Sequence, residues 1–117
     1  MFLRIQCSRD KHTLVVDIEG ELDHHTSDVF RDKVDNALKD PTIKNIVYDL
    51  SHLKFMDSSG VGVFIGRYKI ISRRGGVAAA AGLKPQIHKV FEVSGLYTII
   101  KKYNDVQEAL ADIRGVR

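Results

Sequence analysis

The segment FMDSSGVGVFIG, residues 55–66, contains the side chains of this sequence that are best placed to take part in chemistry. An acid, Asp57, precedes Ser58 and Ser59, and the apolar spacing that follows predicts a helix over 58–73. A serine at a helix start commonly caps the helix by accepting a hydrogen bond from a backbone N–H. The same position also suits a phosphate, because the helix dipole and free N–H groups favour an anion there. The residues alone leave both interpretations open.

A phosphate on Ser58 would strongly change the charge of this surface. It adds about −1.5 to −2 charges at pH 7, beside the carboxylate of Asp57. A partner docked there would meet like-charge repulsion and an uncompensated buried charge, and both weaken binding. The segment therefore has the chemistry of an on/off switch on an interface.

Three glycines, Gly60, Gly62 and Gly66, lie in the same predicted helix. Each disfavours a helix by about 1 kcal/mol relative to alanine, so their presence needs a reason. Either the helix packs tightly on a sheet, or an external partner rests on its first turns. The spacing does not separate these two explanations.

Other chemistries fit this sequence less well. The spacing Gly60-x-Gly62-x-x-x-Gly66 differs from the dinucleotide motif, and no Gly-Lys-Ser/Thr follows it. Ser58 also lacks the G-x-S-x-G context of a hydrolase nucleophile. We therefore expect no enzyme and no cofactor, and keep a small nucleotide-binding or hydrolytic protein as the alternative from a different class. We expect no metal site, because the histidines are too dispersed: His12, His24, His25, His52 and His88.

The composition is that of one globular domain, which we expect to span residues 1–117. Hydrophobic residues make up 44% of the chain and charged residues 28%. A single cysteine, Cys7, excludes an intramolecular disulfide, suits a reducing compartment, and is expected to be a buried apolar side chain. Arg4 and Arg9 interrupt any signal peptide, and no apolar run approaches a membrane span. We expect a cytoplasmic protein without membrane contact.

The net charge of +3 is modest, and the basic residues are scattered along the chain. A nucleic-acid surface would need a basic stripe with interleaved aromatic residues, and the sequence has none. We therefore expect protein partners rather than direct contact with nucleic acid.

Hydrophobic periodicity predicts the elements that must position Ser58. Leu14, Val16 and Ile18 alternate toward a core in a strand that Gly20 is expected to end. The helix at 58–73 is expected to bury Val61, Phe64, Ile65, Tyr68 and Ile71. The expected order is a hairpin of strands 2–7 and 13–20, a helix that carries Phe30, Val34, Ala37 and Leu38, strand 45–50, helix 58–73, strand 76–82, helix 85–94, strand 97–102 and helix 105–114.

This order predicts an α/β fold with a mixed β-sheet and helices packed against it. Strands 45–50 and 76–82, joined by the helix between them, should be parallel neighbours with a right-handed connection. Functional sites in such sheets lie at the carboxyl ends of strands, near the following helix N-termini. Residues 51–60 occupy such a place.

Three segments closely resemble the anti-sigma factor antagonists, which are small proteins with a STAS domain. They are GELDHHT (20–26), FMDSSGVGVFIGRYK (55–69) and FEVSGLYTII (91–100). The resemblance covers essentially the whole chain in the right order. MDSSG is typical of the wider group, whereas GELDHHT favours the sporulation branch. The resemblance implies the STAS fold, in agreement with the elements expected above.

The resemblance also implies a function by partner switching. The unphosphorylated protein would bind an anti-sigma factor that is also a serine kinase, and so free the sporulation sigma factor F. RNA polymerase would be affected only indirectly. The kinase would phosphorylate Ser58, the first serine of the motif, and the phosphoprotein would dissociate until a serine phosphatase reset it. The alternative within this class is an antagonist in another sigma pathway, such as general stress.

The family further implies a set of partner-binding residues. Glu21, Leu22 and Asp23 are expected in a loop near Ser58, although Asp23 by itself is typical of a turn or cap. Asp57 either positions the Ser58 hydroxyl or caps the helix. The complete expected set is Glu21, Leu22, Asp23, Asp57, Ser58, Ser59, Gly60 and Gly62, in which Ser59 is a second cap hydroxyl, a docking residue or a fallback phosphate acceptor.

Overall fold

A computed structural model describes residues 2–115 of the chain as a five-stranded sheet with helices on both faces. The strand order is β1-β2-β3-β4-β5, with β1 antiparallel to β2 and all other neighbours parallel. The fold class predicted from the sequence is therefore confirmed. The elements are β1 (Leu3–Asp10), β2 (Thr13–Leu22), α1 (Ser27–Ala37), β3 (Asn45–Met56), α2 (Ser58–Arg73), β4 (Ala78–Ala81), α3 (Pro85–Ser94), the 3-10 helix η1 (Leu96–Thr98), β5 (Lys101–Tyr103) and α4 (Val106–Ile113).

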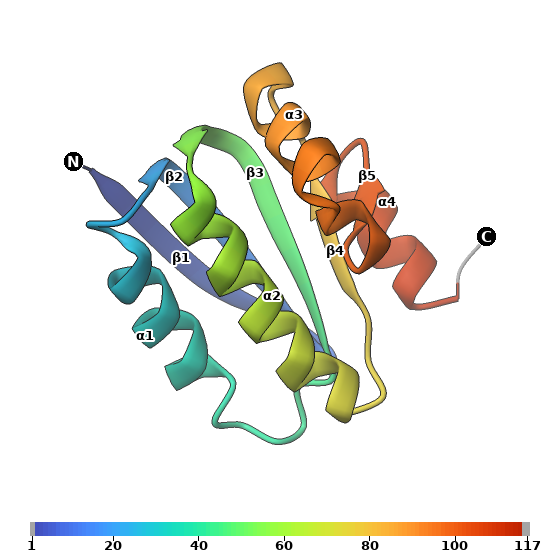
Figure 1. Cartoon of the computed structure of the whole chain (residues 1–117). Helices are drawn as coiled ribbons and strands as arrows, with labels where there is room; N and C mark the ends of the chain where they lie inside the picture. The colour runs from blue at the N-terminus through green and yellow to red at the C-terminus, as the bar shows by residue number, and fades with distance from the viewer. Residues whose placement is uncertain (1, 116–117) are drawn as a thin grey trace.

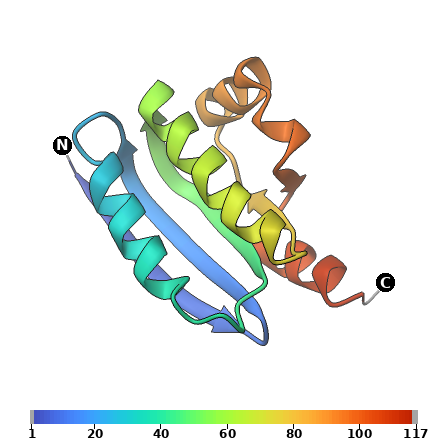
Figure 2. The same ribbon diagram turned by 60° about the horizontal axis from the view of Figure 1, so that its bottom comes forward.

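Helices α1, α2 and α3 cover one face of the sheet, and α4 covers part of the other (Figures 1 and 2). The larger core lies under α1 to α3, where Leu14, Val16 and Ile18 are buried as the alternation predicts. Aromatic rings from α1, β3, α2 and α3 meet there, since Phe64 contacts Phe30, Tyr48 and Phe91. This packing fixes α2, the helix that begins at Ser58, against the middle of the sheet.

The helices over 58–73 and 85–94 have the bounds that the sequence predicts. Pro85 opens α3, because its fixed φ and missing N–H suit the first helical turn. Gly95 closes α3 with a φ of 80°, a left-handed conformation that glycine adopts without strain. Proline and glycine constrain the backbone directly, so these two residues were sufficient to predict where α3 begins and ends.

The expected end of the second strand at Gly20 is wrong, because β2 continues to Leu22. Gly20 has a φ of +112°, and a Cβ there would lie 2.2 Å from the carbonyl oxygen of Phe2. The pairing with β3 shifts register at this point and then resumes. Gly20 therefore marks an irregularity within the strand, as glycine often does.

The strand expected over 97–102 is also largely wrong. Residues Leu96–Thr98 form η1, and β5 begins only at Lys101. Leu96 and Ile100 are buried in the core under the helices, so the apolar run serves a turn of helix rather than a strand. Short apolar runs do not distinguish these two states by periodicity. The strand expected at 76–82 is shortened to Ala78–Ala81.

The buried face of α2 differs in part from the expected one. Phe64 and Ile71 are buried as expected, but Ile65 is 36% exposed, whereas Val63 and Arg67 are buried. The Arg67 guanidinium lies between α1 and α2, where its Nε is 3.0 Å from the Asp35 carboxylate. This ion pair explains how a cation is accommodated on the inner face of the helix. The core face of α2 is therefore rotated, which leaves Ile65 at the surface.

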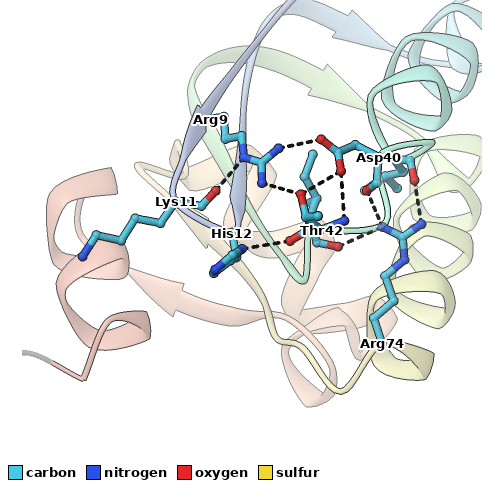
Figure 3. A network of polar contacts seen from close by, with 8 residues as sticks. Arg9, Lys11, His12, Asp40, Thr42 and Arg74 are labelled. Atoms are coloured by element: carbon cyan, nitrogen blue, oxygen red, sulfur yellow. Dashed lines mark hydrogen bonds and ion pairs between the residues drawn. The ribbon is translucent and has the colours of Figure 1, made fainter.

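A polar network holds the end of α2 that is opposite to Ser58 (Figure 3). Arg74 donates hydrogen bonds to the carbonyl oxygens of Leu38, Asp40 and Ile43. Hydrogen bonds from Thr42 and then from Arg9 lower the pKa of Asp40 to about 2. The network connects the β1–β2 turn, the α1–β3 loop and the end of α2 by hydrogen bonds.

Cys7 lies on β1 and is half-buried rather than fully buried. It packs against the core under the helices, and burial raises the pKa of its thiol. The residue therefore behaves as an apolar side chain at the edge of the core.

Candidate functional site

The parallel strands β2 and β3 end together and so bring two distant segments of the chain into contact. Leu22 is paired with Met56, and the Asp57 N–H donates to the Leu22 carbonyl oxygen at 3.2 Å. The start of α2 therefore lies directly beside the β2–α1 turn, at the top of the sheet in Figure 1. This is the carboxyl edge of the parallel strands, where the sequence predicts the site.

Asp57 is the residue that caps α2. Its side chain accepts a hydrogen bond from the Ser59 N–H at 2.8 Å. Its backbone carbonyl oxygen accepts the N–H groups of Gly60 at 3.0 Å and of Val61 at 3.3 Å. The structure thus assigns the capping role to Asp57 and not to Ser58 or to the Ser59 hydroxyl.

Ser58 occupies the first turn of α2, and its side chain is exposed. Within residues 2–115 its hydroxyl makes no hydrogen bond, so Asp57 does not hold it in place. A phosphate on this oxygen would find the N–H groups of Ser59, Gly60 and Val61 already bonded to Asp57. The phosphate would therefore lie on the open surface and add charge there, instead of binding to the N–H groups at the start of the helix.

The glycines of α2 divide into two kinds. Gly60 is buried, and a Cβ on it would lie 3.1 Å from Met56 Cε and 3.2 Å from Leu22 Cγ. Gly62 is exposed, and a Cβ on it would meet nothing within 4 Å. Tight packing therefore accounts for Gly60. Gly62 instead keeps the outer surface of the helix flat and open beside Ser58.

The expectation that Glu21 and Leu22 lie in a loop is wrong, since they are the last residues of β2. The strand extends this far because β3 continues beside it to Met56. Leu22 is fully buried, and its side chain lies under Gly60. Glu21 is half-buried.

Asp23 is a buried turn residue. Its Oδ1 accepts hydrogen bonds from the N–H groups of His25 at 2.8 Å and Thr26 at 3.0 Å. Burial raises the pKa of Asp23, but these hydrogen bonds outweigh that effect and lower it. The carboxylate thus shapes the turn that leads into α1, as expected of a cap or turn residue.

A shallow groove of about 420 Å³ lies beside Ser58, between α2 and α3. One of its apolar lining side chains, Val93, is strongly exposed, at 79%. The groove is lined by Met56, Asp57, Ser58 and Val61 on one side and by Lys89, Val90, Val93 and Ser94 on the other. We call it the Ser58 groove.

The α3 wall of this groove was not expected from the sequence. The sequence signal is weak, because Ile87 and Phe91 form the buried face of α3, Val90 packs partly against the core, and only Val93 is strongly exposed. A single exposed apolar side chain is common at protein surfaces. Only the fold shows that Val93 lines a groove together with Ser58.

Residues 2–115 contain neither a candidate metal site nor a candidate membrane-spanning helix. No three histidine, cysteine, aspartate or glutamate side chains gather there in an arrangement that could hold a metal ion. No helix in that range is both long and apolar enough to cross a membrane.

The chain is similar to a defined group of proteins. The STAS domain family matches residues 4–109. An anti-sigma F factor antagonist of Paenibacillus polymyxa is 40% identical over 116 residues, which cover 99% of each chain. The anti-sigma-B factor antagonist of Bacillus subtilis is 30% identical, with 86% of this chain and 90% of the relative covered.

Solved structures agree with these matches. The anti-sigma factor antagonist SpoIIAA in its unphosphorylated form superposes with a TM-score of 0.80 at 30% identity, covering 97% of this chain and 99% of that chain. Bacillus SpoIIAA in the phosphorylated form gives a TM-score of 0.71 at 30% identity, covering 95% and 100%. The chain therefore belongs to the STAS domain family and, within it, to the anti-sigma factor antagonists.

Proposed function

We propose that the unphosphorylated protein binds its anti-sigma factor through the Ser58 groove and thereby frees sigma factor F. The observation that carries this proposal is the position of an exposed, unbonded serine hydroxyl at the rim of an apolar groove. Apolar lining side chains such as Val61 and Val93 supply contact area that a partner can cover. Transcription by RNA polymerase then changes only through the sigma factor.

Phosphorylation of Ser58 is the step that ends binding in this proposal. The anti-sigma factor acts as the kinase: the γ-phosphoryl group of ATP passes to Ser58 Oγ, the hydroxyl proton is released and ADP leaves. The new dianion lies beside the Asp57 carboxylate at the edge of an apolar surface. A docked partner would bury this charge without compensation, so the complex dissociates. A serine phosphatase returns the protein to its binding state.

The relatives support this cycle. SpoIIAA, which has the same fold, exists in an unphosphorylated and a phosphorylated form. The sigma F assignment rests on the 40% identity to a sigma F antagonist, compared with 30% to a sigma B antagonist. An antagonist of a general stress pathway remains the second candidate, because the sigma B relative also matches most of the chain.

The proposed partner-binding residues fall into two groups. Ser58, Ser59 and Gly62 lie in the first turns of α2 and are exposed or half-buried, and Glu21 is half-buried near the end of β2, so we assign them direct contact. Leu22, Asp23 and Gly60 are buried, and Asp57 is engaged in capping. We propose that Leu22, Asp23 and Gly60 shape the surface from beneath, whereas Asp57 both caps α2 and lines the Ser58 groove beside the partner. In this proposal the protein acts in the cytoplasm as a single STAS domain over residues 1–117, without a cofactor of its own.

A phosphotransfer experiment tests the proposal. The purified protein is incubated with ATP alone and with ATP plus the candidate anti-sigma kinase, and the products are mapped by mass spectrometry. Phosphate on Ser58 only when the kinase is present is the expected result, with Ser59→Ala still modified and Ser58→Ala unmodified. Nucleotide turnover by the protein alone, or modification elsewhere with Ser58 untouched, would overturn the proposal.

A further inference from the structure

Lys89, on helix α3, faces Ser58 across the groove. Both side chains line the same hollow of about 420 Å³, Ser58 from the start of α2 and Lys89 from the middle of α3. Lys89 is exposed and forms no ion pair with any residue in the described part of the chain. A long flexible cation is therefore free to respond to a change of charge on Ser58.

Two carboxylates next to the groove lining, Asp57 and Glu92, contact other groups of the protein. The Asp57 carboxylate accepts the Ser59 N–H. On α3, the Glu92 carboxylate lies 3.9 Å from His88 Nε2, one turn earlier on the helix. Lys54, on β3, does not line the groove. Lys89 is the cation that lines the groove together with Ser58.

The walls of the groove suit a lysine stem. Met56, Val61, Val90 and Val93 supply apolar surface between Lys89 and Ser58. A lysine side chain can lay its methylenes along such a surface while its ammonium group reaches a polar site at the end. Ion pairs between an ammonium group and a phosphate are shorter and stronger than hydrogen bonds between neutral groups.

We propose that Lys89 responds to phosphorylation of Ser58. After phosphorylation, its ammonium group forms an ion pair with the phosphate across the groove. Its methylenes then cover the apolar walls, so that the modified protein occupies its own docking groove. This inference rests on the proposed phosphorylation of Ser58. In the proposed function, repulsion by the phosphate drives the partner away. The ion pair with Lys89 would act in addition, because it is an attractive contact within the phosphorylated protein.

The pairing is measurable without any partner. The protein is phosphorylated on Ser58, and the second pKa of the phosphate is determined by phosphorus NMR in the parent, Lys89→Gln and Lys69→Gln proteins. Lys69 is the matched control, because it is an exposed lysine on α2 that lies outside the Ser58 groove. We expect the second pKa to be lower by about 0.4 in the parent and in Lys69→Gln than in Lys89→Gln, because a nearby cation favours the dianion.

A second measurement tests whether the Lys89 methylenes cover the apolar walls of the groove. In the phosphorylated parent, NMR contacts are expected between the Lys89 methylenes and the methyl groups of Val61 or Val93, and these contacts should be weaker before phosphorylation. Equal pKa values in the parent and Lys89→Gln, or an equal change in Lys69→Gln, would overturn the inference while leaving the proposed switch intact. A protein that the kinase does not phosphorylate on Ser58 would instead overturn the proposed function itself.

Discussion

The Asp57 carboxylate accepts the Ser59 backbone N–H at 2.8 Å, so the residue before Ser58 caps helix α2 and Ser58 itself is left free. Capping and the proposed phosphorylation thus involve different residues of the same short motif. The cap of α2 does not use the Ser58 hydroxyl. In the proposed switch, the charge of the surface can therefore change without removing the hydrogen bond that caps the helix.

Removing the Asp57 cap should lower the stability of the protein while leaving Ser58 available for phosphorylation. Asp57→Ala is expected to reduce the free energy of unfolding by about 1 kcal/mol, because the Ser59 N–H loses its partner. Urea denaturation measures this change. Asp57→Asn retains an acceptor oxygen and should restore most of the loss. If the two variants were equally destabilised, the capping role would be contradicted.

Gly62 offers a way to separate stability from partner binding. Gly62→Ala should stabilise the protein by up to about 1 kcal/mol, because alanine favours the helix and its Cβ meets nothing within 4 Å. The same methyl group should weaken binding of the anti-sigma factor if a partner rests on this turn. Denaturation and calorimetric titration report the two effects.

Gly66→Ala is the matched control for this variant, since a Cβ there also has open space around it. It lies one turn further along α2, away from Ser58, and should stabilise the protein while leaving affinity unchanged. Unchanged affinity in Gly62→Ala would show that no partner approaches this turn.

The pKa of Asp40, lowered to about 2 from an ordinary value of 3.8, predicts a pH dependence of stability. A carboxyl whose pKa is lower in the folded protein stabilises the fold above the ordinary value and loses this effect as the pH falls toward 2. Asp40→Asn should therefore reduce the loss of thermal stability between pH 5 and pH 2, as measured by circular dichroism. Asp32→Asn, an exposed carboxyl outside the network, serves as the control. An identical acid response in all three proteins would contradict the role of the network.

Substitution of Ser58 should mimic the two states of the switch. Ser58→Asp places a permanent charge at the groove rim and should weaken binding of the anti-sigma factor by at least tenfold while leaving the fold intact. Ser58→Ala should block phosphorylation and bind permanently. Circular dichroism confirms the fold, and calorimetry gives the affinities. Tight binding by Ser58→Asp would count against the electrostatic mechanism.

The sequence predicts those parts of the molecule that depend on local backbone signals. Proline at the start and glycine at the end define α3, and alternation assigns Leu14, Val16 and Ile18 to the core. Tertiary contacts decide the rest. Gly20 permits an irregularity within β2 instead of ending it, and the apolar run after Gly95 folds into η1 because the core takes Leu96 and Ile100.

At the site, too, the sequence predicts only what depends on local signals, and tertiary contacts decide the rest. The motif at 57–60 marks the place, but only the fold shows that Asp57 caps and that Leu22 is buried under Gly60. The opposite wall of the groove comes from α3, more than 30 residues away in the chain, so spacing in the sequence could not place Val90 and Val93 beside Ser58. The available signal was weak, because Val90 packs partly against the core and only Val93 is strongly exposed.

The affinity of the anti-sigma factor for the protein before and after phosphorylation tests the central claim most directly. Calorimetric titration is performed on unmodified protein, on protein carrying phosphate on Ser58 and on Ser58→Ala treated with the same kinase. The account predicts tight binding by the unmodified protein and by Ser58→Ala, and an affinity at least tenfold weaker for the phosphorylated protein. Equal affinities of the modified and unmodified forms would contradict it.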